Sequence, residues 1–259
     1  MKLVSCFLVA VASCTAAQAQ DAGAVLSRMY GAYSSATRYA QSASSTVEER
    51  LGQGAANYSG FSSVLRFERP NRLFVQVTSP KVGTVTAVSD GKTLTIHNSM
   101  KRQYTRQPAE STLTGILRQL RATGIATDAE PLYFLQGSVS HRVTAPKLKA
   151  PATVNGVPCH VLVGSYRTET LMPGSNAQVT LWIGRDDGFL RKTKLVFPTI
   201  QGKVRVVDPK TRKVTKEQAT TLSRSVTMVI QEHQVAPTFA ADTFTFTPPP
   251  GSTEAKPPK

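Results

Sequence analysis

The residue types that most often carry catalysis are few in this chain and lie far apart. Its four histidines belong to no His-Glu-x-x-His or Cys-x-x-Cys metal pattern: His97, His141, His160 and His233. Cys159 and His160 are neighbours, but neighbouring residues of a strand point to opposite faces, so they make no nucleophile and base pair. No Gly-x-Ser-x-Gly motif, P-loop or dinucleotide-binding glycine motif is present. We therefore expect no catalytic residue, metal, cofactor or enzyme activity, with a site built from distant residues as the alternative.

The N-terminus has the parts of a secretory signal peptide. Lys2 precedes the short apolar run Leu3–Ala12, and small residues follow up to Ala19. The run is too short to span a bilayer, which needs about 20 apolar residues. We expect residues 1–19 to be a cleaved signal peptide and the mature protein to be exported. In a competing interpretation, the residues that end in Cys14 resemble a bacterial lipoprotein signal, and a lipidated Cys14 would anchor the chain to a membrane.

Composition limits both the stabilising chemistry and the partners. Cleavage after Ala19 removes Cys6 and Cys14, so Cys159 is left alone and no intrachain disulfide can form. The chain has 31 basic and 16 acidic residues, a net charge of +15. So basic an exported protein favours anionic partners such as phospholipid headgroups. No nucleic-acid-binding motif is present, and nucleic acid is not an expected partner.

Strands with one buried face dominate the predicted structure. Between Val64 and Tyr104 apolar residues alternate with polar ones, and Asp90-Gly91 is a two-residue hairpin signal. A second hairpin is predicted at Asp186-Asp187-Gly188. The remaining strands are predicted at Tyr39–Leu51, Tyr58–Phe67, Ser138–Thr144, Thr153–Ser165, Ala177–Arg185, Leu190–Pro198, Ser223–Gln234 and Thr243–Thr247.

Three helices are expected beside these strands. Asp21 can cap a first helix with one apolar face, formed by Val25, Leu26, Met29, Tyr30 and Tyr33. Glu110–Ala122 has apolar residues at helical spacing, with Ser111 or Thr112 as the cap: Leu113, Ile116, Leu117 and Leu120. A shorter helix is predicted at Asp128–Gln136. The fold class is therefore α+β, with a large antiparallel sheet that curls over its helices.

Two segments are expected to be less tightly packed than the rest. Gln201–Thr221 is a basic excursion between two strands, either a solvated long hairpin or a contact with an anionic surface. The chain from Pro248 is rich in Pro, Gly and Lys, and we expect residues 251–259 to be a disordered tail after one domain over residues 20–250.

Several short motifs resemble one family. They are RFERPNRL at Arg66–Leu73, SDGKTL at Ser89–Leu94, Tyr104, Leu181-Trp182-Ile183, and the late Phe239, Phe244, Phe246 and Pro248. Over roughly Ala24 to Gly251 the chain resembles the superfamily of outer-membrane lipoprotein carriers and their lipoprotein receptors. Within that superfamily it looks most like a family of uncharacterised, predicted periplasmic proteins. The resemblance implies a half-open β-barrel whose helices close a concave face around a hydrophobic cavity. In related carriers this cavity accepts acyl chains.

The expected function follows from this resemblance. A monomeric periplasmic protein would bind a lipid, an acyl chain or another amphiphile, with possible roles in lipid or lipoprotein trafficking. The alternative is an envelope interaction or stress-sensing module that uses the barrel as a scaffold and its basic surface to contact a partner or a membrane. Arg69 and Arg72 would lie at the cavity rim, unless they are solvated turn residues. The predicted cavity lining, which a filled core would equally require, is Leu65, Phe67, Leu73, Val75, Leu94, Ile96, Leu117, Leu120, Val179, Leu181, Val226 and Met228.

Overall fold

The computed structural model describes residues 21–81, 83–123, 143–167, 176–207 and 214–256. The predicted signal peptide, Cys14, His141 and the predicted helix Asp128–Gln136 lie outside these residues. Within them the chain forms two helices and thirteen strands joined in one sheet.

Both described helices were predicted, and each has a side-chain cap. α1 (Ala22–Ser35) begins after Asp21, whose carboxylate accepts from Gly23 N, and its buried face comprises Val25, Leu26, Met29 and Tyr33. α2 (Leu113–Ala122) begins after Thr112, whose hydroxyl accepts from Gly115 N at 3.1 Å. Each cap satisfies a backbone N–H that has no partner inside its helix. The buried face of α2 comprises Leu113, Gly115, Ile116, Leu117 and Leu120.

The sheet is antiparallel except at one edge, and it does not close. Its strands are β1 (Arg38–Leu51), β2 (Ala56–Glu68), β3 (Arg72–Ser79), β4 (Gly83–Asp90), β5 (Thr93–Asn98), β6 (Gln103–Pro108), β7 (Val143–Val154), β8 (Val157–Arg167), β9 (Asn176–Gly184), β10 (Leu190–Val196), β11 (Ile200–Val207), β12 (Val214–Val235) and β13 (Thr253–Glu254). The order is β13-β6-β5-β4-β3-β2-β1-β12-β10-β9-β8-β7, and β11 pairs with β12 outside this path. The long β1 and β12 lie side by side in the middle.

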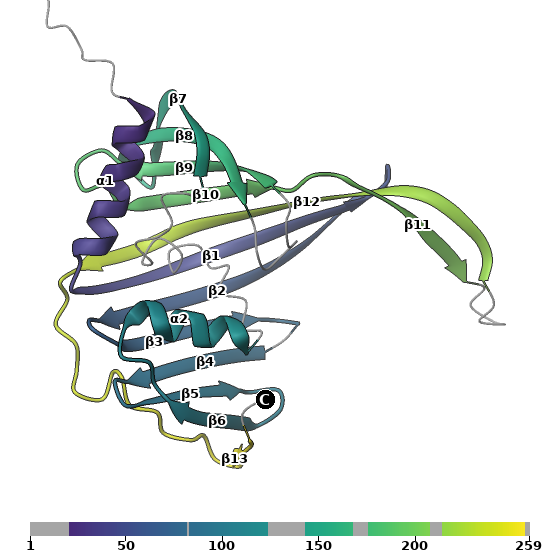
Figure 1. Cartoon of the computed structure of the whole chain (residues 1–259). Helices are drawn as coiled ribbons and strands as arrows, with labels where there is room; N and C mark the ends of the chain where they lie inside the picture. The colour runs from purple at the N-terminus through teal and green to yellow at the C-terminus, as the bar shows by residue number, and fades with distance from the viewer. Residues whose placement is uncertain (1–20, 82, 124–142, 168–175, 208–213, 257–259) are drawn as a thin grey trace, which may run out of the picture.

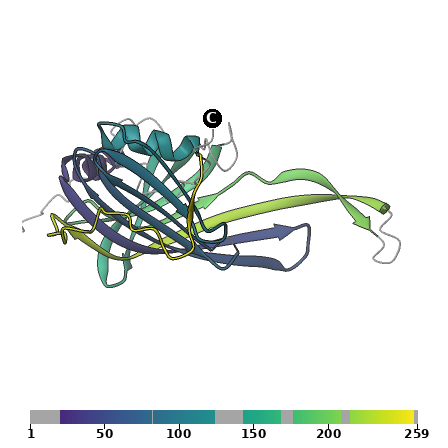
Figure 2. The same ribbon diagram turned by 90° about the horizontal axis from the view of Figure 1, so that it is seen from below.

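The sheet curves around its helices, as predicted. α1 crosses the strands of the β7–β12 half, and α2 lies over β3 and β4 in the other half (Figure 1). Both helices are on one side of the sheet (Figure 2), the side we call the inner face. Inner-face residues and the buried residues of both helices form one apolar core. The predicted fold class, a large curved antiparallel sheet with helices on its concave side, is confirmed.

The basic excursion is a long hairpin. β11 pairs with the first part of β12, from Ile200 opposite Leu222 to Val207 opposite Val214. This hairpin extends well beyond the rest of the sheet (Figure 2). The predicted long hairpin is therefore confirmed, and residues 208–213, which connect its strands, lie outside the described residues. We call residues 200–207 and 214–222 the arm.

The predicted strand Thr153–Ser165 is wrong, because it joins two strands and the turn between them. β7 ends at Val154 and β8 begins at Val157. Asn155 and Gly156 connect them with φ angles of 49° and 79°. Both angles lie in the left-handed region that the favoured two-residue hairpin turn requires, and Asn-Gly adopts it readily.

The C-terminal predictions also need correction. Thr243–Thr247 is not a strand, because Thr243 N and Thr245 N bond to Ala240 O and Asp242 O within their own segment. The chain is not a disordered tail from Gly251, since Thr253 and Glu254 form β13, parallel to Gln103 and Tyr104 of β6. Arg106 pairs with Glu254 at 3.2 Å.

The C-terminal segment packs on the outer face of the sheet. Phe244 is 1% exposed, and the Arg72 guanidinium lies 4.6 Å from its ring centre. The ring of Phe246 lies 5.8 Å from that of His97 and 5.5 Å from that of Tyr104. We call residues 237–252 the strap.

Candidate functional site

The predicted lining residues gather in one apolar core on the inner face. Ten of them are buried: Leu65, Phe67, Leu73, Val75, Leu94, Leu117, Leu120, Val179, Leu181 and Met228. Ile96 and Val226 are partly buried and pack against the same core. The common face was thus predicted correctly from the two-residue period. That these residues line a ligand cavity stays a prediction.

The side chains in the middle of the inner face are smaller than those at its two ends. Ala43 and Ser45 of β1 and Ser63 of β2 are small, and all three are buried. Ala43 is paired with Ser63 on one side and with Ile230 on the other. β1 and β2 lie between α1 and α2 (Figure 1). Small inward side chains therefore occupy the strip between the two helices, with large aliphatic and aromatic groups on either side.

The predicted rim arginines have partners within the protein. Arg69 Nε donates to Ala36 O at 3.0 Å, so it binds the C-terminal end of α1, and burial lowers the pKa of Arg69. Arg72 donates to Glu68 at 3.1 Å and stacks on Phe244. Both guanidiniums hold elements together, and a role for them at a rim stays a prediction.

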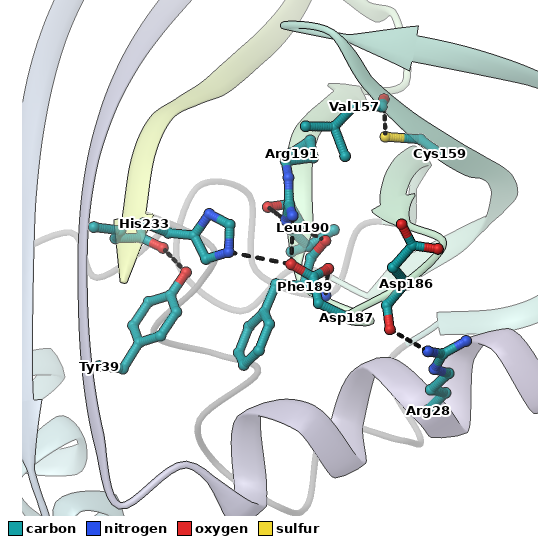
Figure 3. A network of polar contacts seen from close by, with 11 residues as sticks. Arg28, Tyr39, Val157, Cys159, Asp186, Asp187, Phe189, Leu190, Arg191 and His233 are labelled. Carbon is teal, nitrogen blue, oxygen red and sulfur yellow. Dashed lines mark hydrogen bonds and ion pairs between the residues drawn. The ribbon is translucent and has the colours of Figure 1, made fainter. Parts of the chain in front are cut away.

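A polar cluster that was not predicted lies beside α1 (Figure 3). Arg191 of β10 is 7% exposed, and it donates to Asp187 and to Phe189 O. His233 Nε2, from the end of β12, lies 3.3 Å from the same Asp187 oxygen, while Phe189 N donates to the other at 3.0 Å. Burial alone would raise the pKa of Asp187, but the hydrogen bonds from His233, Arg191 and Phe189 outweigh it and hold this pKa well below its usual value.

Aromatic rings surround this cluster and join it to the core. The ring of Phe189 stacks on Tyr39 at 5.3 Å and meets Tyr33 of α1 edge-on at 4.9 Å. Tyr39 donates to Gln41 at 3.0 Å, and burial raises the pKa of Tyr33 to about 12. Both carboxylate oxygens of Asp187 are engaged within the protein. The cluster therefore ties α1, β1, β10 and β12 together.

No spacing in the sequence could have found this cluster. Asp187-Gly188 was predicted as a turn, which is confirmed, and Gly188 has a φ of 74°. His233 belongs to no motif of the sequence, and the structure places it against Asp187, 46 positions earlier in the chain. Only the pairing of β10 with β12 brings the two together.

Two pockets lie at the end of β12. One, of about 480 Å³, is lined by Arg191, His233 and Asn155 among others. The other, of about 330 Å³, lies under the strap and includes Arg66 and Phe239. None of the predicted lining residues borders either pocket.

Other reactive groups are buried or dispersed. Cys159 is fully buried, its thiol donates to Val157 O, and burial raises its pKa. Among the described residues, no three His, Cys, Asp or Glu side chains approach closely enough to hold a metal ion. Within the same residues, no helix has the length and apolar character needed to cross a bilayer.

Similar solved structures have low sequence identity. Lipoprotein LppX from Mycobacterium tuberculosis matches with a TM-score of 0.45 and 12% identity, over 84% of this chain and 97% of that one. LprF from Mycobacterium bovis matches with a TM-score of 0.42 and 13% identity, over 84% of this chain and 94% of that one. A LolA superfamily protein from Nitrosomonas europaea matches with a TM-score of 0.32 and 10% identity, over 88% of this chain and 99% of that one.

No curated protein matches the chain. A family model does: residues 22–206 match the family described as "Predicted periplasmic protein (DUF2092)". The match covers well over half of the chain, and it confirms both the predicted family and the predicted periplasmic location. This chain belongs to the DUF2092 family of periplasmic proteins.

Proposed function

We propose that the protein binds a lipid, an acyl chain or another amphiphile on its inner face, as a monomer and without chemical conversion. The observation that carries this proposal is the continuity of the apolar inner face across both halves of an open sheet. Apolar surface from strands far apart in the chain meets there, and the two described helices lie over different halves (Figure 1).

The strip between the helices supports the proposal. Its inward residues Ala43, Ser45 and Ser63 project little from the sheet. An extended hydrocarbon chain would therefore fit over them with smaller shifts of the protein's atoms than over leucine or phenylalanine. Transfer of such a chain from water to apolar surroundings is favourable by about 0.8 kcal/mol per CH₂ group. This gain, less the cost of ordering the bound chain, is the driving force for binding.

Native mass spectrometry of protein purified from the periplasm tests this function. We expect adducts whose masses match fatty acids or phospholipids, which organic extraction removes and added oleate restores. Protein that is consistently bare and also fails to take up oleate or dioleoylphosphatidylglycerol would contradict the proposal.

A matched pair of variants locates the site. Ser45→Leu places a larger side chain in the inner strip, and we expect it to lower the bound lipid fraction. Thr46→Leu makes the same type of change at the neighbouring exposed position on the other face, and we expect wild-type loading. Circular dichroism checks that both variants fold, since overpacking costs about 1–3 kcal/mol.

The second candidate is an envelope interaction module, and the arm is the observation that favours it. Projecting hairpins with exposed side chains are suited to contact another surface. The two candidates are compatible, because the arm and the inner strip are different parts of the molecule.

A further inference from the structure

Three large aliphatic residues form a row where the arm leaves the sheet. Leu222 of β12 is paired with Leu51 of β1 on one side and with Ile200 of β11 on the other. Directly paired residues in antiparallel strands have their side chains on the same face. The three side chains are 46%, 37% and 42% exposed for Leu51, Leu222 and Ile200 respectively. They form a continuous exposed apolar patch.

This row continues the inner face of the sheet. Along β12, Leu222 shares its face with Arg224, Val226 and Met228, because alternate residues of a strand point the same way. Met228 is buried in the core and Val226 packs against it. Between the core and the row, Arg224 Nε lies 3.5 Å from Glu49 of β1. The apolar row therefore lies outside this ion pair, on the side of the arm.

The arm has little support of its own. From Thr221 toward its start, β12 pairs with no strand except β11 among the described residues. A two-stranded ribbon is marginally stable in water. An apolar row exposed at the base of such a ribbon indicates a surface that is covered in use.

Charge decides which partner fits this row. The chain has a net charge of +15. Residues 200–222 contain only two acidic residues, Asp208 and Glu217, against six basic ones: Lys203, Arg205, Lys210, Arg212, Lys213 and Lys216. A second copy of so basic a hairpin would be repelled, whereas an anionic lipid surface attracts basic groups within about one Debye length, roughly 8 Å at physiological salt.

We propose that Leu51, Leu222 and Ile200 dock the protein on an anionic lipid membrane. The three side chains enter the headgroup region, and the basic hairpin supplies the long-range attraction. This combination of apolar burial and electrostatic attraction is the one that binds peripheral proteins to membranes. The proposal does not depend on amphiphile binding at the inner strip.

Sedimentation with lipid vesicles tests it, using the mature exported protein. The vesicles are an equal mixture of phosphatidylglycerol and phosphatidylcholine, with pure phosphatidylcholine as the neutral comparison. The test variant replaces all three residues by threonine, which preserves strand propensity: Leu51→Thr, Ile200→Thr and Leu222→Thr. The control variant removes two exposed apolar side chains outside the arm, Met100→Thr and Val235→Thr, which are 68% and 50% exposed.

We expect wild type and control to bind the anionic vesicles and to be released by salt. The triple variant should bind at least about tenfold more weakly, and Leu51→Thr alone should show part of this loss if the triple variant does not fold. Wild-type protein that ignores anionic vesicles would overturn the proposal, as would equal binding to neutral vesicles. Undiminished binding by the folded threonine variants would do the same.

Discussion

At the scale of single residues, the contact between Arg191 and Asp187 stands out because one partner is nearly inaccessible. The Arg191 side chain is 8% exposed, whereas that of Asp187 is 36% exposed. A buried guanidinium without its carboxylate would keep its desolvation cost and lose its main compensation. His233 adds a further contact to the same oxygen. The short loop after β9 thus connects to the far end of β12 through Asp187.

Replacing this carboxylate should cost far more than replacing its neighbour. We expect Asp187→Ala to lower the free energy of unfolding by about 3 kcal/mol, because it leaves the buried charge of Arg191 without a carboxylate partner. Asp186 is exposed and its contact with Arg28 uses the backbone carbonyl, so Asp186→Ala is a matched control that should cost under about 0.5 kcal/mol. Urea denaturation of the two variants measures the difference.

The same prediction has a pH dependence. The pKa of Asp187 is lower in the folded protein than in the unfolded chain, so its contribution is fully present above the unfolded pKa, about 4. It is lost progressively as pH falls from there through the folded pKa. Wild type should therefore lose stability below about pH 4 more steeply than Asp187→Ala. Parallel pH profiles, or equal costs for the two alanine variants at pH 7, would contradict the assigned role.

At the scale of elements, the strap is the part that local sequence patterns mispredicted. Phe244 and Phe246 alternate with threonines, which favours a strand when neighbours alone are considered. In the structure these rings pack against side chains of β3, β5 and β6, more than a hundred residues earlier in the chain. Such long-range contacts overrode the local pattern.

Replacing Phe244 tests how strongly the strap is attached to the sheet. It is 1% exposed and meets Phe239 edge-on at 5.1 Å. We expect Phe244→Ala to lower the free energy of unfolding by about 3–5 kcal/mol. Thr245→Ala, at the next, exposed position, should change it by under about 0.5 kcal/mol. If the two variants unfold at the same urea concentration, the strap does not contribute to the fold.

The other elements show when local reasoning succeeds. Between Val64 and Tyr104, alternation and turn residues agree with each other, and the strands were predicted there. At Asn155-Gly156 the sequence carries a turn signal, but the strand-forming residues on both sides favour one continuous strand. The inner face was predicted because period-two alternation defines a face directly. The contact of Asp187 with His233 could not be predicted from the sequence, because it depends on which strands pair.

At the scale of the whole molecule, β12 connects two environments. Residues Val226–Val229 lie between β1 and β10, in the middle of the sheet. Residues Val214–Thr221 pair only with β11 among the described residues. One strand of 22 residues therefore runs from the core of the protein into the arm. Local stability is expected to follow the number of packed neighbours, so it should fall along β12 from the core toward the arm.

Amide hydrogen exchange can measure this gradient. We expect the amides of Val214–Thr221 that bond to β11 to exchange at least about 100-fold faster than those of Val226–Val229, because opening the ribbon exposes no core. β9 is flanked by β8 and β10 and should match the slow part of β12. The inner strip should then be rigid while the arm opens independently, which leaves the arm free to adapt to a surface without disturbing a bound amphiphile. Uniform protection along β12 would mean that the arm and the sheet unfold as one unit, and this division of roles would be wrong.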